Sequence, residues 1–210
     1  VLLANQKDLE NGRRAGVPEA TLDRLRLDRD RLKEMARGVR AIAALPDPIG
    51  TEFDNRTLSN GLLVSKRCVP LGVIGSIYES RPNVTIDIAS LCLKSGNACI
   101  LRGGSEALES NSELCSLIQK ALEDSGIPKE CVQFISNQDR GIVNRMLKMN
   151  KYIDLLIPRG GADLVKFVAQ HATMPTVSGG IGVCHIYVDH QFNLRDVIKI
   201  VVNAKTQRPS

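Results

Sequence analysis

Two glycine-rich turns carry the residues best suited to chemistry, and each turn begins with an arginine. One spans Arg102–Glu106 and reads RGGSE, and the other spans Arg159–Gly161 and reads RGG. An arginine suits a phosphate group, an acid suits a ribose hydroxyl, and paired glycines let a ligand approach the backbone closely. The glycines alone are equally consistent with tight turns. The arginines and the acid favour a nucleotide site.

Common motifs for nucleotides and for nucleophilic catalysis are absent. Gly103 and Gly104 lack the third glycine of G-x-G-x-x-G, Gly72 and Gly75 come too early for it, and there is no G-K-[ST] loop. The histidines at positions 171, 185 and 190 give no Ser/His/Asp spacing, and His185 alternates with strand residues as a structural residue would. The residues alone therefore indicate a nucleotide-binding α/β domain whose reaction stays open.

The glycine turns follow apolar runs in which polar residues do not alternate, and the strands predicted from such runs would position the turns. Val73–Ile77 and Ala98–Leu101 are such runs, and a segment of helical periodicity lies between them. Strands covered on both faces lack alternation, so this order predicts a parallel sheet with crossover helices. Ligands of such sheets bind beyond the carboxyl ends of the strands. We therefore expect the loops Ser80–Asn83, Arg102–Glu106 and Arg159–Gly161 to open on one edge.

The other elements follow from periodicity and capping residues. Further strands are expected at Cys131–Ile135, Ile153–Ile157, Leu62–Val69 and Cys184–Val188. Helices are expected at Pro18–Leu25, from a cap at Asp28 to Leu45, from a Ser110/Glu113 capping box to Leu122, at Gln138–Met149, from the turn at Gly161 through His171, and at Asn193–Asn203. Val1–Gly16 and Thr51–Gly61 are polar segments with turn signals, and we place no helix or strand in them.

Composition bounds the function classes. The chain has 210 residues, of which 43% are hydrophobic, and a net charge of +5 from 28 basic and 23 acidic residues. The excess is small and spread out, and aromatic residues make up only 3%, whereas proteins that bind single-stranded nucleic acid stack bases on rings. We therefore expect no nucleic-acid partner. A site for an anionic substrate or cofactor explains the mild basicity.

The six cysteines form no C-x-x-C pair and no zinc-spaced cluster with histidine, so no metal site is expected. Four of them lie in apolar runs or on apolar helix faces, where a cysteine acts as a small buried hydrophobe. This usage indicates a reduced compartment, and we expect a cytoplasmic location. No signal peptide and no membrane-length apolar run is present, so no membrane association is expected.

Longer motifs resemble one known family. Pro70–Asn111, which reads PLGVIGSIYESRPNVTIDIASLCLKSGNACILRGGSEALESN, is similar to the gamma-glutamyl phosphate reductase family of the aldehyde dehydrogenase superfamily. IDLLIPRGG, GGIGVCHIYVD and VNAKTQRP resemble the same family, and the similarity covers nearly the whole chain. YESRPNVT and NAKTQRP are specific to it. The resemblance implies an α/β, aldehyde-dehydrogenase-like fold with a mostly parallel Rossmann-type sheet and helices on both faces.

The resemblance also implies the second step of proline synthesis from glutamate. NADPH would reduce L-glutamyl 5-phosphate to L-glutamate 5-semialdehyde, with release of phosphate and NADP. A cysteine thiolate would displace phosphate from the acyl carbon and give a thioester, which accepts hydride well. A homo-oligomer is implied for the full-length protein, with glutamate 5-kinase as a candidate partner.

One departure from the family concerns the nucleophile. The family's catalytic cysteine follows the NAKTQRPS motif, and this chain stops at Ser210, so no catalytic residue is expected within it. Family members are also longer. We therefore interpret residues 1–210 as an N-terminal cofactor-binding domain, truncated at both ends, without the catalytic domain and the oligomerisation arm. This fragment of a larger fold is expected to be inactive by itself.

The resemblance implies roles for individual residues. Those that match the superfamily's turn for the adenosine ribose and 2′-phosphate are Arg102, Gly103, Gly104, Ser105 and Glu106. Those that match a second turn, near the pyrophosphate, are Arg159, Gly160 and Gly161. The loop that faces the substrate is matched by Ser80, Arg81 and Asn83. Lys205 and Arg208 lie beside the missing nucleophile and either hold the departing phosphate or are simple cations at a helix C-terminus.

Two other functions stay open. A CoA-dependent acylating aldehyde dehydrogenase would share the superfamily motifs, and a choice between glutamyl phosphate and acyl-CoA as substrate separates it from the reductase. A non-catalytic module would bind nucleotide or assemble with partners without turnover.

Overall fold

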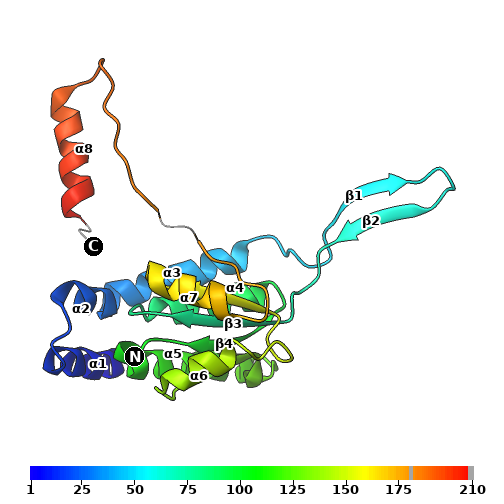
Figure 1. Ribbon diagram of the computed structural model, residues 1–210, viewed down its shortest axis with the longest axis horizontal. Helices are drawn as coiled ribbons and strands as arrows, with labels where there is room; N and C mark the ends of the chain where they lie inside the picture. Colours follow the sequence, from blue (N-terminus) through cyan, green and yellow to red (C-terminus); the bar gives the residue numbers. More distant parts are fainter. Residues whose placement is uncertain (180–181, 208–210) are drawn as a thin grey trace. The chain divides into compact units, whose positions relative to one another are not determined.

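The computed structural model describes residues 1–179 and 182–207 (Figure 1). The chain divides into two compact units, Val1–Ser178 and Gly179–Ser210, and each is described by itself. The first unit contains a four-stranded sheet and seven α-helices. Within the described ranges, no helix is long and apolar enough to cross a membrane.

The central sheet is parallel throughout and has the order β5-β4-β3-β6. Its strands are β3 (Val73–Tyr78), β4 (Ala98–Arg102), β5 (Val132–Phe134) and β6 (Leu155–Arg159). All four were predicted from apolar runs. β5 is shorter than expected because Cys131 ends a 3-10 turn, η2 (Lys129–Cys131), and β6 begins two residues later than expected. Since the strands run the same way, the loops that follow them share one edge, as predicted.

Helices cover both faces of the sheet, which explains why its strands lack alternation. On one face, Ile74 and Tyr78 pack with α4 (Asn83–Lys94) and α5 (Leu108–Asp124). On the other, Ile77 and Leu156 pack with α6 (Arg140–Met146) and α7 (Ala162–His171). The middle of β3 has no room for a larger residue, since a Cβ on Gly75 would lie 2.6 Å from Leu156 Cδ2. The predicted architecture is confirmed.

The N-terminal segment is helical, so the expectation of no element in Val1–Gly16 is wrong. It forms α1 (Leu2–Arg14), followed by α2 (Glu19–Leu25) and α3 (Arg29–Ala44). The buried face of α1 is partly polar, which hid its periodicity. The Asn5 amide donates 2.8 Å to the Leu25 carbonyl, and its Oδ1 accepts from Leu27 N at 2.7 Å. α3 has no buried residue and begins at the predicted Asp28 cap.

The start of α5 also differs from the prediction. The helix begins at Leu108, after the 3-10 turn η1 (Ser105–Ala107), so Ser110 and Glu113 are not a capping box. The cap comes instead from the buried Asp8 side chain of α1. Its carboxylate accepts hydrogen bonds from Glu109 N at 3.1 Å and Ser110 N at 2.8 Å. A distant residue thus satisfies the first N–H groups of the helix.

Removing this cap should weaken the fold. We expect Asp8→Ala to lower the free energy of unfolding by about 1 kcal/mol, the usual effect of losing a capping side chain. Urea denaturation measures it. Asp163→Ala is the matched control, because Asp163 is an exposed acid in the first turn of α7 and should cost less than about 0.5 kcal/mol. Equal losses in both variants would contradict the role of Asp8.

A hairpin precedes the sheet. It consists of β1 (Glu52–Thr57) and β2 (Leu63–Arg67), which pair antiparallel. β2 lies within the predicted strand Leu62–Val69, whereas β1 falls in Thr51–Gly61, where no element was expected. Every residue of β1 is exposed, so the strand carries no buried apolar pattern that would identify it. The expected turn is present, with Gly61 at φ +86°.

Among its described residues, the second unit contains one helix, α8 (Leu194–Thr206), which confirms the expected helix. Its cap is Asn193, whose Oδ1 accepts from Arg195 N at 3.0 Å. The expected strand at Cys184–Val188 is wrong: the segment pairs with no other strand among the described residues. His185 is exposed, so its expected structural role is not borne out either. An apolar run forms a strand only where a neighbour pairs with its backbone.

Candidate functional site

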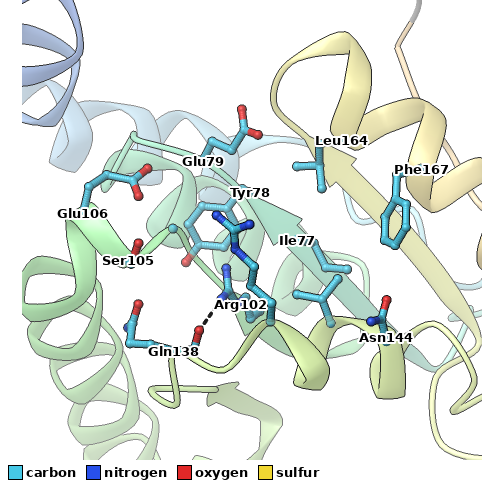
Figure 2. Close-up of a pocket in the computed structure, with 13 residues that line it drawn as sticks. Ile77, Tyr78, Glu79, Arg102, Ser105, Glu106, Gln138, Asn144, Leu164 and Phe167 are labelled. Atoms are coloured by element: carbon cyan, nitrogen blue, oxygen red, sulfur yellow. Dashed lines mark hydrogen bonds between the residues drawn. The ribbon is translucent and has the colours of Figure 1, made fainter. Parts of the chain in front are cut away.

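A cavity of about 400 Å³ opens at the carboxyl edge of the sheet. Figure 2 shows Ser105 and Glu106 on one side of it, Leu164 and Phe167 on the other, and Tyr78 between them. The lining residues come from the ends of β3 and β4, from η1, and from α6 and α7. The cavity therefore lies where parallel α/β sheets bind their ligands.

Two arginines bring positive charge to this cavity. Arg102 ends β4, and its Nη2 donates a long hydrogen bond of 3.4 Å to the Gln138 carbonyl (Figure 2). Arg140 is the first residue of α6 and also lines the cavity. Within the described ranges, neither guanidinium forms an ion pair. Two unpaired guanidinium groups facing one cavity suit an anion such as a phosphate group.

The cavity also contains two carboxylates, and both are hydrogen-bonded to backbone. Glu106 Oε1 accepts from Ser80 N at 2.6 Å and from Ser80 Oγ at 2.8 Å. Glu79 Oε2 accepts from Gly161 N at 2.8 Å and so caps the amino end of α7. These bonds join the loop after β3 to the turns after β4 and β6.

The two glycine turns, predicted to bind the cofactor, are placed differently. Arg102, Gly104, Ser105 and Glu106 line the cavity. Gly103 instead packs against the buried Asn111 amide and the Tyr78 ring. Arg159 is the last residue of β6, and Gly160 and Gly161 follow it at the same edge, but none of the three is among the cavity's lining residues.

The predicted substrate residues are only partly brought together. Ser80 lies beside Glu106, and Asn83 Nδ2 donates to Asp87 Oδ2 at 2.9 Å within α4. Arg81 follows Ser80 and is exposed. Lys205 is exposed on α8, in the second unit. Arg208 lies outside the described residues.

A buried polar network of Tyr78, Thr85 and Asn111 packs against the turn at Gly103. The Tyr78 hydroxyl and Thr85 Oγ1 are 2.7 Å apart, and Thr85 Oγ1 donates to Asn111 Oδ1 at 2.9 Å. Asn111 Nδ2 has no hydrogen-bond partner in the described part of the chain. Burial raises the pKa of Tyr78 above its usual range, so the phenol stays protonated. Tyr78, which lines the cavity, thus contributes a neutral group to the site.

No cysteine lines the cavity, and all six are free. Burial raises the pKa of Cys115 to about 11, and the neighbouring Cys92 thiol together with burial raises that of Cys99. Protonated, buried thiols are poor nucleophiles. Within the residues that the structure describes, no cluster of His, Cys, Asp or Glu could hold a metal ion.

Glu79, Gln138, Arg140 and Phe167 belong to the site but were not predicted. Gln138 and Arg140 could have been found by topology, because they follow the strand expected at Cys131–Ile135 and the same edge rule applies to that strand. Phe167 carries no local signal, since an aromatic residue on a helix is usually part of the core. Glu79 directly precedes the predicted substrate loop, and nothing in its neighbours marks it as a cap for α7.

Comparison with known proteins identifies relatives across the whole chain. No family model matches it. It is 55% identical over 210 residues to a gamma-glutamyl phosphate reductase of Dehalococcoides mccartyi, covering all of this chain and 50% of the relative. The crystal structure of the Thermotoga maritima gamma-glutamyl phosphate reductase superimposes with a TM-score of 0.88 at 45% identity, covering 99% of this chain and 50% of that one.

A more distant structure shows the wider fold. A propionaldehyde dehydrogenase of Rhodopseudomonas palustris, solved with bound propionyl-CoA, is 23% identical, with a TM-score of 0.56 over 84% of this chain and 43% of that one. The chain spans about half the length of the curated relatives it matches. Over all of its 210 residues, the chain is therefore homologous to the gamma-glutamyl phosphate reductases and has the fold of aldehyde dehydrogenases.

Proposed function

We propose that the protein containing this chain reduces L-glutamyl 5-phosphate to L-glutamate 5-semialdehyde with NADPH, in proline biosynthesis. The observation that carries this proposal is 55% identity over all 210 residues to a gamma-glutamyl phosphate reductase. We further propose that residues 1–210 form the cofactor-binding domain. The catalytic domain, the oligomerisation arm and the nucleophilic cysteine would lie in the part of the relatives that this chain does not span, and the chain alone would be inactive.

The cavity residues fit NADPH. The cavity volume of about 400 Å³ is in the range of small-molecule sites. Arg102 and Arg140 have no ion-pair partner among the described residues, and they suit the extra 2′-phosphate by which NADPH differs from NADH. Phe167 offers an apolar wall. When bound, the nicotinamide supplies a hydride to the acyl carbon of the substrate. The second glycine turn, Arg159–Gly161, is proposed to lie near the pyrophosphate.

The substrate side of the proposal rests on fewer contacts. Ser80, Arg81 and Asn83 are proposed to face the glutamyl phosphate, and Lys205 and Arg208 to hold the phosphate that leaves. We also propose a homo-oligomer in the cytoplasm, with glutamate 5-kinase as a partner that supplies the labile acyl phosphate. The free cysteines suit a reducing compartment.

An assay of the full-length protein tests the function. NADPH oxidation is followed with freshly generated L-glutamyl 5-phosphate and, separately, with an acyl-CoA. We expect turnover with the acyl phosphate and little with the thioester. Preference for acyl-CoA would favour an acylating aldehyde dehydrogenase. Binding of NADPH without turnover of either substrate would favour a non-catalytic nucleotide-binding module.

A further inference from the structure

The loop after β3 contains a strained residue. Ser80 has φ +46°, a backbone conformation that residues other than glycine rarely adopt. The two residues that flank Ser80 are hydrogen-bonded to each other: the Arg81 N–H donates to the Glu79 carbonyl at 2.6 Å, which closes a three-residue turn. A γ-turn with positive φ at its centre is rare and strained. Such strain persists only where the surrounding structure holds the residue in place, and it is concentrated at functional sites.

One carboxylate oxygen provides that hold. Glu106 Oε1 accepts both the Ser80 backbone N–H at 2.6 Å and the Ser80 hydroxyl at 2.8 Å. Hydrogen bonds to an ionised carboxylate are shorter and stronger than bonds between neutral groups. Both residues are half-buried, which limits competition from water. Glu106 therefore fixes the backbone and the side chain of Ser80 together.

Glu79, the residue before Ser80, is held in place by separate hydrogen bonds. Glu79 Oε2 accepts from Gly161 N at 2.8 Å, and Glu79 N donates to the Arg159 carbonyl at 3.2 Å. The turn at Ser80 is thus held on one side by the Arg102–Glu106 turn and on the other by the Arg159–Gly161 turn. Loss of Glu106 alone should release Ser80 while Glu79 remains anchored.

We propose that Glu106 is a positioning residue for the substrate loop Ser80–Asn83, which it holds in the strained conformation that the substrate requires. The proposal rests on the proposed function, which makes this loop the substrate loop. It differs from the role that the family resemblance implies for Glu106, a contact to the cofactor ribose. Because Oε1 already takes two hydrogen bonds from Ser80, we expect loss of Glu106 to affect the acyl phosphate more than NADPH.

Steady-state kinetics and cofactor titration of the full-length enzyme separate the two roles. We expect Glu106→Ala to raise the KM for L-glutamyl 5-phosphate about tenfold and to change the NADPH Kd less than about twofold. Glu106→Gln keeps an acceptor oxygen and should stay within about threefold of the wild type for both. Glu34→Ala removes an exposed acid of α3 and should change neither. A loss confined to NADPH affinity would overturn the proposal.

Glycine at position 80 provides a rescue. Glycine adopts positive φ without strain, so a loop with Ser80→Gly should no longer need Glu106. Adding Glu106→Ala to Ser80→Gly should then raise KM less than about threefold, against about tenfold in the Ser80 background. Equal effects in the two backgrounds would contradict the proposal, because a direct contact of Glu106 with a ligand does not depend on backbone strain at residue 80.

A measurement without substrate keeps this inference separate from the proposed function. Hydrogen exchange of the peptide covering residues 78–84 should speed up about tenfold in Glu106→Ala and stay unchanged in Glu34→Ala. Thermal unfolding of each variant checks that the protein is folded. A full-length wild-type protein that shows no turnover of L-glutamyl 5-phosphate would overturn the proposed function. Unchanged exchange in a folded Glu106→Ala variant would overturn the role of Glu106.

Discussion

Replacing Arg102 and Arg140 together with alanine is expected to weaken NADPH binding about a hundredfold and to change NADH binding much less. Each guanidinium lines the cavity and has no ion-pair partner in the described ranges. A hydrogen bond to a charged group contributes about 1.5–3 kcal/mol, and about 1.4 kcal/mol corresponds to a factor of ten in Kd. Arg102→Ala alone should weaken NADPH binding roughly tenfold. NADH has no 2′-phosphate and gains little from either arginine.

Fluorescence titration of both cofactors against wild type and variants decides this. Arg145→Ala is the matched control, because Arg145 is also an exposed arginine of α6 but does not line the cavity. It should leave both affinities within about twofold, since a distant exposed charge is screened by salt. An equal loss for NADPH and NADH in the double variant would show that the arginines hold the turn or the shared ribose.

The second large effect is expected for Gly103→Ala. A Cβ at this position would collide with Asn111 Nδ2 and lie 3.1 Å from Tyr78 Cε2. Neither neighbour can move easily: Asn111 and Tyr78 are fully buried, and both are hydrogen-bonded to Thr85. Overpacking of this kind costs about 1–3 kcal/mol. We therefore expect the free energy of unfolding to fall by that amount, and NADPH binding to weaken as the turn shifts.

Gly38→Ala is the control for this substitution. Gly38 lies inside α3, and a Cβ added to it would have no neighbouring atom within 4 Å, so alanine meets no steric conflict there. Alanine is the better helix former, and we expect stability to rise by up to about 1 kcal/mol. Urea denaturation of both variants measures the free energy of unfolding, which should fall in Gly103→Ala and rise in Gly38→Ala. An unchanged free energy of unfolding in Gly103→Ala would contradict the prediction and show that the Asn111 side chain can rotate out of the way.

Much of the sheet could be predicted from sequence because its strands are buried on both faces. Continuous apolar runs such as Val73–Ile77 have few alternatives in a chain of this composition. The same reasoning places the loops after β3, β4 and β6 at one edge, which the structure confirms. Helices α4 to α7 follow because each covers the sheet with a regular apolar stripe.

Two elements, α1 and β1, could not be predicted in this way, because neither has a regular apolar face. The inward face of α1 carries Asn5 and Asp8, whose partners lie far along the chain, so no local pattern marks the helix. β1 is exposed throughout. Cys184–Val188 has the composition of a strand, but whether it pairs depends on a neighbour that local sequence does not specify.

The glycine turns show the limit of reading a site from residue types. The paired glycines were equally consistent with the close approach of a ligand and with tight turns, and at Gly103 and Gly160 the protein's own side chains take the space. A Cβ on Gly160 would lie 2.5 Å from Glu79 Oε2, and one on Gly103 would meet Asn111. Residue type indicated a close approach correctly, but only tertiary contacts reveal which group approaches.

A crystal structure of the full-length protein with NADPH tests the central claim most directly. The claim is that the cavity at the carboxyl edge of the sheet binds the adenosine end of the cofactor. We expect density for the 2′-phosphate within hydrogen-bond distance, about 3 Å, of both the Arg102 and Arg140 guanidinium groups. A cofactor bound away from this cavity, or a 2′-phosphate that contacts neither arginine, would contradict the claim.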